Sequence, residues 1–306
     1  MRRLKTLIAS LAALLATTAL PACAEPAPQA APPTTADDAD PALWVVKDAD
    51  TTIYLFGTVH VLKPGLTWFD EAVKTAFDGS KELVLEMVAP DPQAMQQVVM
   101  ARGIAPEGST PLTQQLPEDK RAAFTKAATD NGLPMTLVDR MEPWLAGVTL
   151  GTLPLGKLGY DPANGPETIL SAEAKKTGKS VAGLETAEQQ LGYFDGLSGP
   201  AQLQFLTSTV DELPKIGTLM SDMVTIWSKG DPDALGRLMN ENLDDSPELA
   251  RTILFERNAR WADWVAQRMA KPGAVFIAVG AGHLAGKDSV QDYLARRGLR
   301  AVRVRY

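Results

Sequence analysis

The chain has two histidines, and both occupy the same local pattern. His60 stands three residues after Gly57 in "YLFGTVH". His283 stands three residues after Gly280 in "IAVGAGH". Each glycine closes an apolar, strand-like run and permits a sharp turn as the chain leaves the strand. A histidine placed there lies at the carboxyl edge of the sheet, where open α/β sheets bind ligands. Two such units on neighbouring strands would direct both imidazoles into one crevice, although each could also be a hydrogen-bonded loop histidine.

Imidazoles in a crevice suit acid–base chemistry or metal binding, and carboxylates complete either kind of site. Glu86 ends the apolar run "ELVLE", and Glu185 ends "SVAGLE". A carboxylate at the end of a buried strand is costly unless it is paired or ligates a metal. The alternative is that either acid interacts with the N-terminus of a following helix. Two histidines with one or two carboxylates form a ligand set for Mn, Co, Zn or Fe, with positions left for a water that the metal can activate.

Other catalytic classes find no support in the sequence. It lacks a Gly-x-Ser-x-Gly elbow, a Walker loop and a paired-glycine dinucleotide fingerprint. The single cysteine, Cys23, precedes the folded region and is not a catalytic nucleophile. A net charge of -7 repels phosphate backbones, so nucleic acid is not expected as a partner. A peptide or small-molecule substrate is expected instead.

Residues 1–24 have the features of an export signal. The basic "MRRLK" precedes the apolar "TLIASLAALLATTAL", which is too short to be a comfortable membrane span. Cys23, in "LPAC", stands where a bacterial lipoprotein carries its lipid-accepting cysteine, while Ala22 and Ala24 also permit ordinary cleavage. Residues 25–41 are rich in Pro, Ala and acid, and predict a flexible tether. We therefore expect an exported protein at the periplasmic face of the cell envelope, attached to the membrane only by a lipid anchor.

Residues 42–306 predict an α/β domain. "ALWVVKDADTTIYLFGT" is typical of a hairpin that turns at "KDAD", and further strand-like runs are "ELVLEM", "KSVAGLE", "AVFIAVG" and "RAVRVRY". Helical patterns cover residues 67–78, 117–130, 166–177, 200–228, 231–242, 247–270 and 288–297. This order predicts a mixed central sheet built from N- and C-terminal strands. A large, mostly helical cap over about 90–270 is inserted between them.

Five segments carry a resemblance to a known family. They are "YLFGTVHVL", "ELVLEM", "GKSVAGLETAEQQL", "ERNARWADWV" and "AVGAGHLAGKDSVQDYLARRGLRAVRV". In this order, and over roughly residues 42–306, the chain resembles the TraB/GumN family. That family is similar to the Tiki proteins, which are membrane-linked metal-dependent proteases. It is more distantly similar to erythromycin-esterase-like and haem-binding ChaN-like proteins.

The resemblance implies an α/β core whose active site combines the two Gly-x-x-His histidines with a glutamate. Carried over by position, these residues are His60, His283 and Glu86. Arg257 and Asn258, in "ERN", match a helix position where the family often has Arg followed by Asn or Asp. An arginine there could hold a carboxylate or bind substrate, or it could form a surface salt bridge.

One departure from the family concerns "GPETIL". The family commonly has an aspartate at this point, before the helix that leads to the Leu-Glu-Thr strand, and this chain has Glu167.

The expected function is that of an exported metal-dependent hydrolase, with peptide hydrolysis as one form. His60 and His283 would hold the metal, and Glu86 would be a ligand or the general base. Residues expected to support them are Gly57, Gly280, Glu185, Arg257 and Asn258. The main alternative is a non-catalytic protein that binds haem, metal or an envelope partner. Two others are metal-free hydrolysis with a histidine base and a family member that serves only structure.

Overall fold

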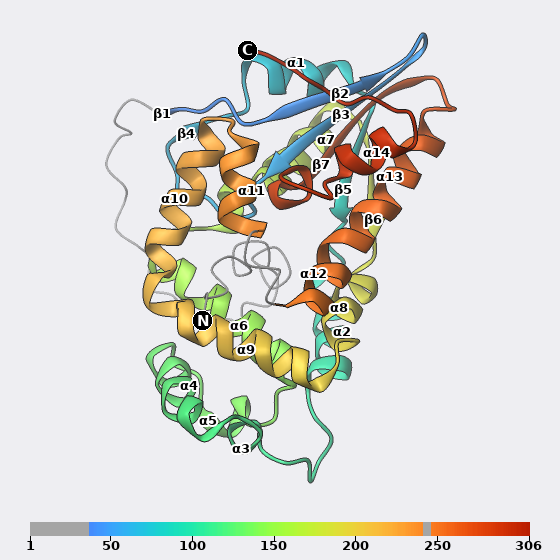
Figure 1. Cartoon of the computed structure of the whole chain (residues 1–306). Coiled ribbons are helices and arrows are strands. Elements are labelled where there is room, and N and C mark those ends of the chain that lie inside the picture. The colour runs from blue at the N-terminus through green and yellow to red at the C-terminus, as the bar shows by residue number, and fades with distance from the viewer. Residues whose placement is uncertain (1–36, 241–245) are drawn as a thin grey trace.

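A six-stranded mixed sheet lies at the centre of the computed structural model, which describes residues 37–240 and 246–306 (Figure 1). The strand order is β6-β5-β7-β3-β2-β8. The strands are β2 (Leu43–Lys47), β3 (Thr51–Thr58), β5 (Glu82–Met87), β6 (Ser180–Glu185), β7 (Gly273–Gly280) and β8 (Val302–Arg303). The prediction of an α/β fold with a mixed sheet is confirmed. The predicted export signal, Cys23 and residues 25–36 of the tether lie outside the described residues.

Four neighbouring strands run in the same direction. β3 pairs in parallel with β7, β7 with β5, and β5 with β6. β2 is antiparallel to β3 across the predicted hairpin, and β8 is antiparallel to β2. The carboxyl ends of the four parallel strands therefore meet at one edge of the sheet. Side chains that follow these strands can share one crevice there.

Two hydrophobic cores flank the sheet, because successive side chains of a strand point to opposite faces. On β3, for example, Phe56 packs into one core while Ile53 and Leu55 pack into the other. The helices of the first core are α1 (Glu71–Gly79), α7 (Pro166–Thr177), α10 (Ile216–Ser228) and α11 (Pro232–Asn240). Those of the second are α13 (Glu256–Arg268) and α14 (Val290–Arg296).

A third core holds a helical lobe together, which lies below the sheet in Figure 1. Its helices are α2 (Pro92–Gly103), α3 (Leu112–Gln115), α4 (Glu118–Asp130), α5 (Met135–Val138), α6 (Pro143–Lys157), α8 (Ala187–Asp195), α9 (Gly199–Glu212) and α12 (Pro247–Ala250). In the described part of segment 90–270, predicted as a helical insertion, the helices and strands that the structure contains are all helices apart from β6, which lies at the edge of the sheet. Within the described residues no helix is both long and apolar enough to cross a membrane.

The folded domain includes residues that precede Ala42, its expected start. Asp37–Asp38 form β1, which pairs with β4 (Leu66–Thr67). Ala39 is 1% exposed and belongs to the first core. Residues 37–41 are therefore part of the fold, although the tether was predicted to extend through them. The sequence of these residues, with its small and acidic side chains, gives no sign that their backbone pairs with β4.

Gly165, the residue before α7, lies against the backbone of His60. A Cβ atom there would overlap the His60 carbonyl oxygen, and φ is an ordinary -68°, so close approach requires the glycine. We expect Gly165→Ala to lower the free energy of unfolding by about 1–3 kcal/mol, because backbone must move. Gly156→Ala is the control, since a Cβ in that helix meets nothing within 4 Å, and it should stabilise by about 0.5–1 kcal/mol. Urea denaturation measures both, and equal effects would contradict the prediction.

Candidate active site

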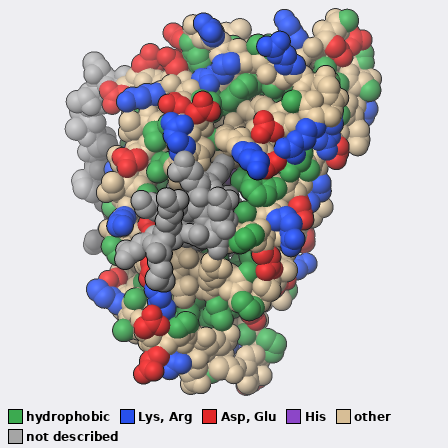
Figure 2. Space-filling model, viewed as in Figure 1, with side chains coloured by type: hydrophobic (Ala, Val, Ile, Leu, Met, Phe, Trp, Pro, Cys, Tyr) green, Lys and Arg blue, Asp and Glu red, His purple; other side chains and the backbone are tan. Residues whose placement is uncertain are grey.

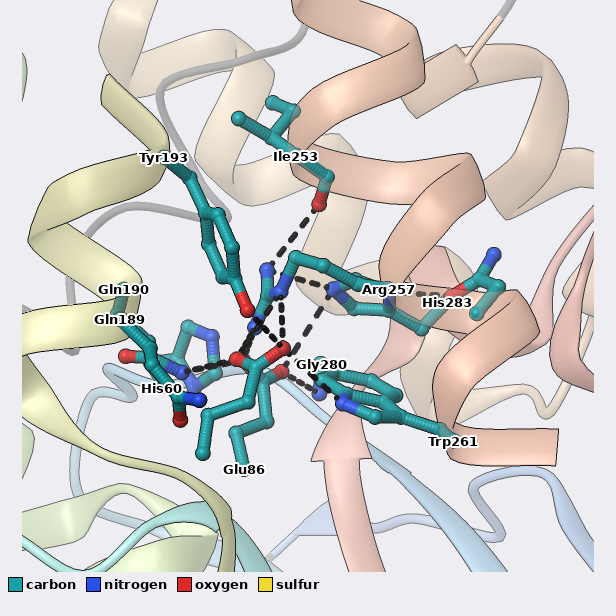
Figure 3. A network of polar contacts seen from close by, with 12 residues as sticks. His60, Glu86, Gln189, Gln190, Tyr193, Ile253, Arg257, Trp261, Gly280 and His283 are labelled. Carbon is teal, nitrogen blue, oxygen red and sulfur yellow. Dashed lines mark hydrogen bonds and ion pairs between the residues drawn. The ribbon is translucent and has the colours of Figure 1, made fainter. Parts of the chain in front are cut away.

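The two Gly-x-x-His turns lie side by side at the carboxyl edge of the sheet. In the parallel pairing of β3 and β7, Thr58 is opposite Gly280. His60 lies two residues after the end of β3, and His283 lies in the 3-10 turn Ala281–Leu284 that follows β7. Their exposed fractions are 6% and 4%, so both histidines are buried. The structure thus brings together the two histidines that the sequence pattern placed in one crevice (Figure 3).

The two glycines of the motif provide space. We expected them to supply unusual φ values, but neither has a positive φ, and that of Gly280 is -50°. A Cβ on Gly57 would be 3.1 Å from Cα of Ala281. A Cβ on Gly280 would be 3.0 Å from Oε1 of Glu86 and 3.3 Å from Nε2 of His60. The missing side chain of Gly280 therefore lets a carboxylate and an imidazole approach the same backbone atom.

Glu86, the penultimate residue of β5, is held as an ionised carboxylate. Its Oε1 accepts the backbone N–H of Gly280 at 2.6 Å and lies 3.8 Å from Nε2 of His283. Its Oε2 accepts from Nη2 of Arg257 at 2.6 Å and from Nε2 of Gln190 at 3.3 Å. Burial alone would raise the pKa of this carboxyl, but Arg257, the histidines and the Gly280 N–H lower it to about 2.

Glu185, the last residue of β6, is 7% exposed and accepts hydrogen bonds from four side chains. Arg257 donates to it from Nε at 3.0 and 3.1 Å and from Nη2 at 2.8 Å. The other donors are Gln190 at 3.1 Å, Tyr193 at 3.2 Å and Trp261 at 3.1 Å. This buried carboxylate is therefore fully satisfied, as a buried charge must be. It anchors Arg257, whose pKa rises above its usual value through the two carboxylates that it pairs with, against the effect of burial.

Arg257 comes from a helix with an irregular turn. The single helix predicted over 247–270 is divided by a π turn, Arg251–Phe255, which directly precedes α13. Such single π turns occur frequently at functional sites. Nη1 of Arg257 donates to the carbonyl of Ile253 at 3.1 Å and lies 3.2 Å from Nε2 of His283. The guanidinium thus joins both carboxylates and one imidazole (Figure 3).

The surroundings of His283 fix its tautomer. Its Nδ1 is 2.6 Å from Oδ1 of Asn258, whose Nδ2 donates to the carbonyl of Asp288 at 2.8 Å. Oδ1 is therefore an acceptor, so Nδ1 carries the proton and Nε2 presents its lone pair to Arg257. Burial, together with the charge of Arg257, lowers the pKa of His283 to about 3. The ring is neutral and packs on Trp261, with 4.3 Å between ring centroids.

His60 has a carboxylate partner in the place where His283 has an amide. Its Nδ1 is 2.6 Å from Oε1 of Glu167, which also accepts the hydroxyl of Thr58. Burial alone would lower the pKa of His60, but Glu167 and the more distant Glu86 raise it to about 9. The imidazolium in turn lowers the pKa of Glu167, although burial alone would raise it. The structure therefore gives a polar role to the residue that departs from the family pattern.

Several residues of the site were missed by sequence reasoning. Gln190 and Tyr193 lie three apart on α8 and direct their polar ends toward Glu185. Trp261 is one turn beyond Arg257 on α13 and also contacts Glu185. The signal in the sequence would have been polar groups at helical spacing on a face that is otherwise apolar. Such spacing does not identify the partner, which here is the end of a distant strand.

A model of the TraB/PrgY/gumN family matches residues 42–303, which include every residue of this site. The chain belongs to the TraB/PrgY/gumN family. Relatives of this family member include an uncharacterized protein of Treponema pallidum (strain Nichols), 23% identical over 276 residues that cover 84% of this chain and 80% of that protein. Metalloprotease TIKI2 of Danio rerio is 25% identical over 320 residues, which cover 87% of this chain and 61% of TIKI2. No solved structure matches.

A further relative of the family member is the uncharacterized protein YbaP of Escherichia coli (strain K12). It is 25% identical over 183 residues, which cover 60% of this chain and 67% of that protein. These matches confirm the resemblance that the Gly-x-x-His and Leu-Glu-Thr segments indicated.

The donor groups of the site, two imidazoles and a carboxylate, fit a metal ion in their chemistry. Each imidazole gives Nδ1 to a protein acceptor, which leaves Nε2 as the ring nitrogen that could bind a metal, as in usual histidine ligands. In the present conformation, however, Nη1 and Nη2 of Arg257 contact His283 and Glu86. Across the described ranges, no group of three or more His, Cys, Asp or Glu side chains is arranged to hold a metal.

The contrast between the pKa values of the two histidines can be measured by NMR. Because the chain has two histidines, substituting one of them assigns the imidazole signals of both. In chelator-treated protein we expect His60 to titrate near pH 9 and His283 to stay neutral down to about pH 3. Glu167→Gln should bring the His60 pKa down toward 6.5 and leave His283 unchanged.

The same pair sets a pH dependence of stability. The pKa of His60 is raised in the folded state, so its ion pair with Glu167 stabilises fully below about pH 6.5 and is lost as pH rises through about 9. The stability advantage of wild type over Glu167→Gln should shrink across that interval. An advantage that grew with pH would contradict the assignment.

Proposed function

We propose that this protein is a metal-dependent hydrolase of peptide bonds, with His60, His283 and Glu86 as the metal ligands. The observation that carries the proposal is the orientation of the two buried imidazoles. Each ring binds a protein acceptor through Nδ1. The ionised carboxylate of Glu86 lies beside them and accepts the backbone N–H of Gly280. The relative TIKI2, which is named a metalloprotease, supports both the metal and the peptide substrate.

When bound, a divalent ion such as Mn, Co, Zn or Fe supplies Lewis-acid polarisation of a substrate carbonyl. The protein residues have separate tasks around it. Glu86 is ionised and can ligate or accept a proton. Glu167 and Asn258 fix the orientation of the two rings. Arg257 is a permanent donor for negative charge that develops on the substrate.

Two contacts of the histidines favour metal-free hydrolysis as a second candidate. The lone pair of His283 already faces Nη1 of Arg257, at 3.2 Å. His60 and Glu167, 2.6 Å apart, form a histidine–carboxylate pair of the kind used for proton transfer. In this alternative His60 exchanges a proton with water or the leaving group while Arg257 binds the substrate oxygen.

Elemental analysis and peptide hydrolysis of the purified protein separate the two candidates. We expect about one divalent metal per chain, and hydrolysis that a strong chelator abolishes. His60→Ala, His283→Ala and Glu86→Gln should each lose metal and at least about 100-fold in activity. Glu167→Gln should weaken metal binding by about 10–100-fold, because it removes the partner of a ligand.

The matched control is Glu82→Gln, at the opposite end of the same strand as Glu86. It should keep both metal and activity. Hydrolysis that survives the chelator but still needs His60 would replace the first candidate by the second. A protein without hydrolytic activity that shifts the Soret band of added haem would instead be a binding protein.

We also propose that the protein is exported and anchored by a lipid on Cys23. The support is the basic and apolar pattern of residues 1–24 and the "LPAC" sequence that ends near them. Cys23→Ser should move the protein from the membrane fraction to the soluble periplasmic fraction and abolish incorporation of labelled palmitate. Wild-type protein that is soluble and unlabelled would establish plain secretion.

A further inference from the structure

We propose that Arg257 is an internal cation of the active site, which holds the ligand atoms in the absence of metal and which a metal ion must displace. The inference rests on the proposed function, because it concerns the same ligands. It adds that metal affinity is set by competition with a side chain of this protein.

The contacts of Arg257 divide into two groups. Nη2 donates to Oε2 of Glu86 at 2.6 Å, and Nη1 lies 3.2 Å from the lone pair of His283. These are atoms of two residues that the metal would need. A guanidinium and a divalent ion cannot both occupy the same lone pair of a neutral imidazole, and they repel each other in a buried site.

The second group of contacts would retain Arg257 after displacement. Nε donates to both oxygens of Glu185, at 3.0 and 3.1 Å, and Nη2 donates to one of them at 2.8 Å. Nη1 also donates to the carbonyl of Ile253 at 3.1 Å. The charged group also lies over the ring of Trp261, with 4.7 Å to the centroid, and over Tyr193 at 5.5 Å. Arg257 can therefore release Glu86 and His283 by a movement of its tip while Glu185 still neutralises it.

Competition of this kind explains an otherwise costly arrangement. Without a cation, Glu86 would be a buried carboxylate whose remaining donors are Gly280 and Gln190. Arg257 supplies the missing positive charge, so the site is stable before metal arrives. Its removal should leave Glu86 and His283 free to bind a cation more tightly.

The experiment measures the affinity of Co²⁺ alone for the chelator-treated protein, by visible absorbance. Arg257→Met should bind Co²⁺ about tenfold or more tightly than wild type, the equivalent of one charge-assisted contact that no longer has to be broken. Adding His283→Ala to this variant should remove the gain. Arg260→Met is the matched control, since Arg260 lies one turn further along α13 and over the ring of Tyr193, at 5.1 Å. It removes the same charge and should change affinity by less than about threefold.

The outcomes separate the two proposals. If wild type binds Co²⁺ and Arg257→Met binds it equally or more weakly, the competition is wrong and the metal site stands. If Arg260→Met tightens binding as much as Arg257→Met, the effect is one of overall charge and the competition is also wrong. If neither wild type nor Arg257→Met binds, both proposals fail.

The Arg257→Met variant should fold, because Glu185 keeps three other donors, Gln190, Tyr193 and Trp261. A second measurement uses the wild-type chain and does not depend on the folding of any variant at Arg257. Independently, titration of the wild type with diamagnetic Zn²⁺ should shift the Nη signals of Arg257 in ¹⁵N-arginine NMR spectra and leave those of Arg260 in place. Unchanged Arg257 signals in Zn²⁺-saturated protein would overturn the proposal.

Discussion

The arrangement of the site depends on the pairing of one guanidinium with two carboxylates at the ends of adjacent strands. Glu86 is the penultimate residue of β5 and Glu185 is the last residue of β6, and Met87 is paired with Glu185 in the parallel register. Two buried carboxylates so placed would repel each other, and burial opposes the ionisation of Glu86. Arg257 resolves both problems, because it donates to each of them. Breaking such a network by removing one partner leaves an uncompensated charge, so its members are interdependent.

The repeated Gly-x-x-His motif does not produce two equivalent histidines. His283 has an amide partner and a neighbouring cation, which keep it neutral, whereas His60 has a carboxylate partner that keeps it protonated. Both rings follow the ends of strands that pair in parallel, β3 and β7. The difference in charge arises because Glu167 gives His60 a carboxylate partner, whereas burial and the charge of Arg257 act on His283, whose partner Asn258 is uncharged. Sites that use two histidines for separate tasks need such a difference in environment.

The sequence predicted the parts of the site that a local pattern records. Apolar runs identified the strands, and residues at the ends of those runs identified the histidines and both glutamates. It did not predict the role of Gly280, because close approach depends on Glu86 from another strand. Nor did it predict the contact of Glu167 with His60. An acid in the first turn of a helix is already explained by its favourable interaction with the helix dipole. The π turn before Arg257 was also missed. It shifts the helical periodicity by one residue, and a shift that small cannot be distinguished from a continuous helix in the sequence pattern.

The division of labour between sheet and insertion follows from these contacts. Glu86 lies in β5, and His60 and His283 lie in the turns that follow β3 and β7; each of these three strands is paired on both sides. The groups that set their charge and orientation are Glu167, Gln190, Arg257 and Asn258, all from the helical insertion. A change in the insertion can therefore alter the protonation state of a reacting group without moving it. The inserted helices are accordingly part of the chemical site, and a description of them as a cap over the sheet would leave out these four side chains.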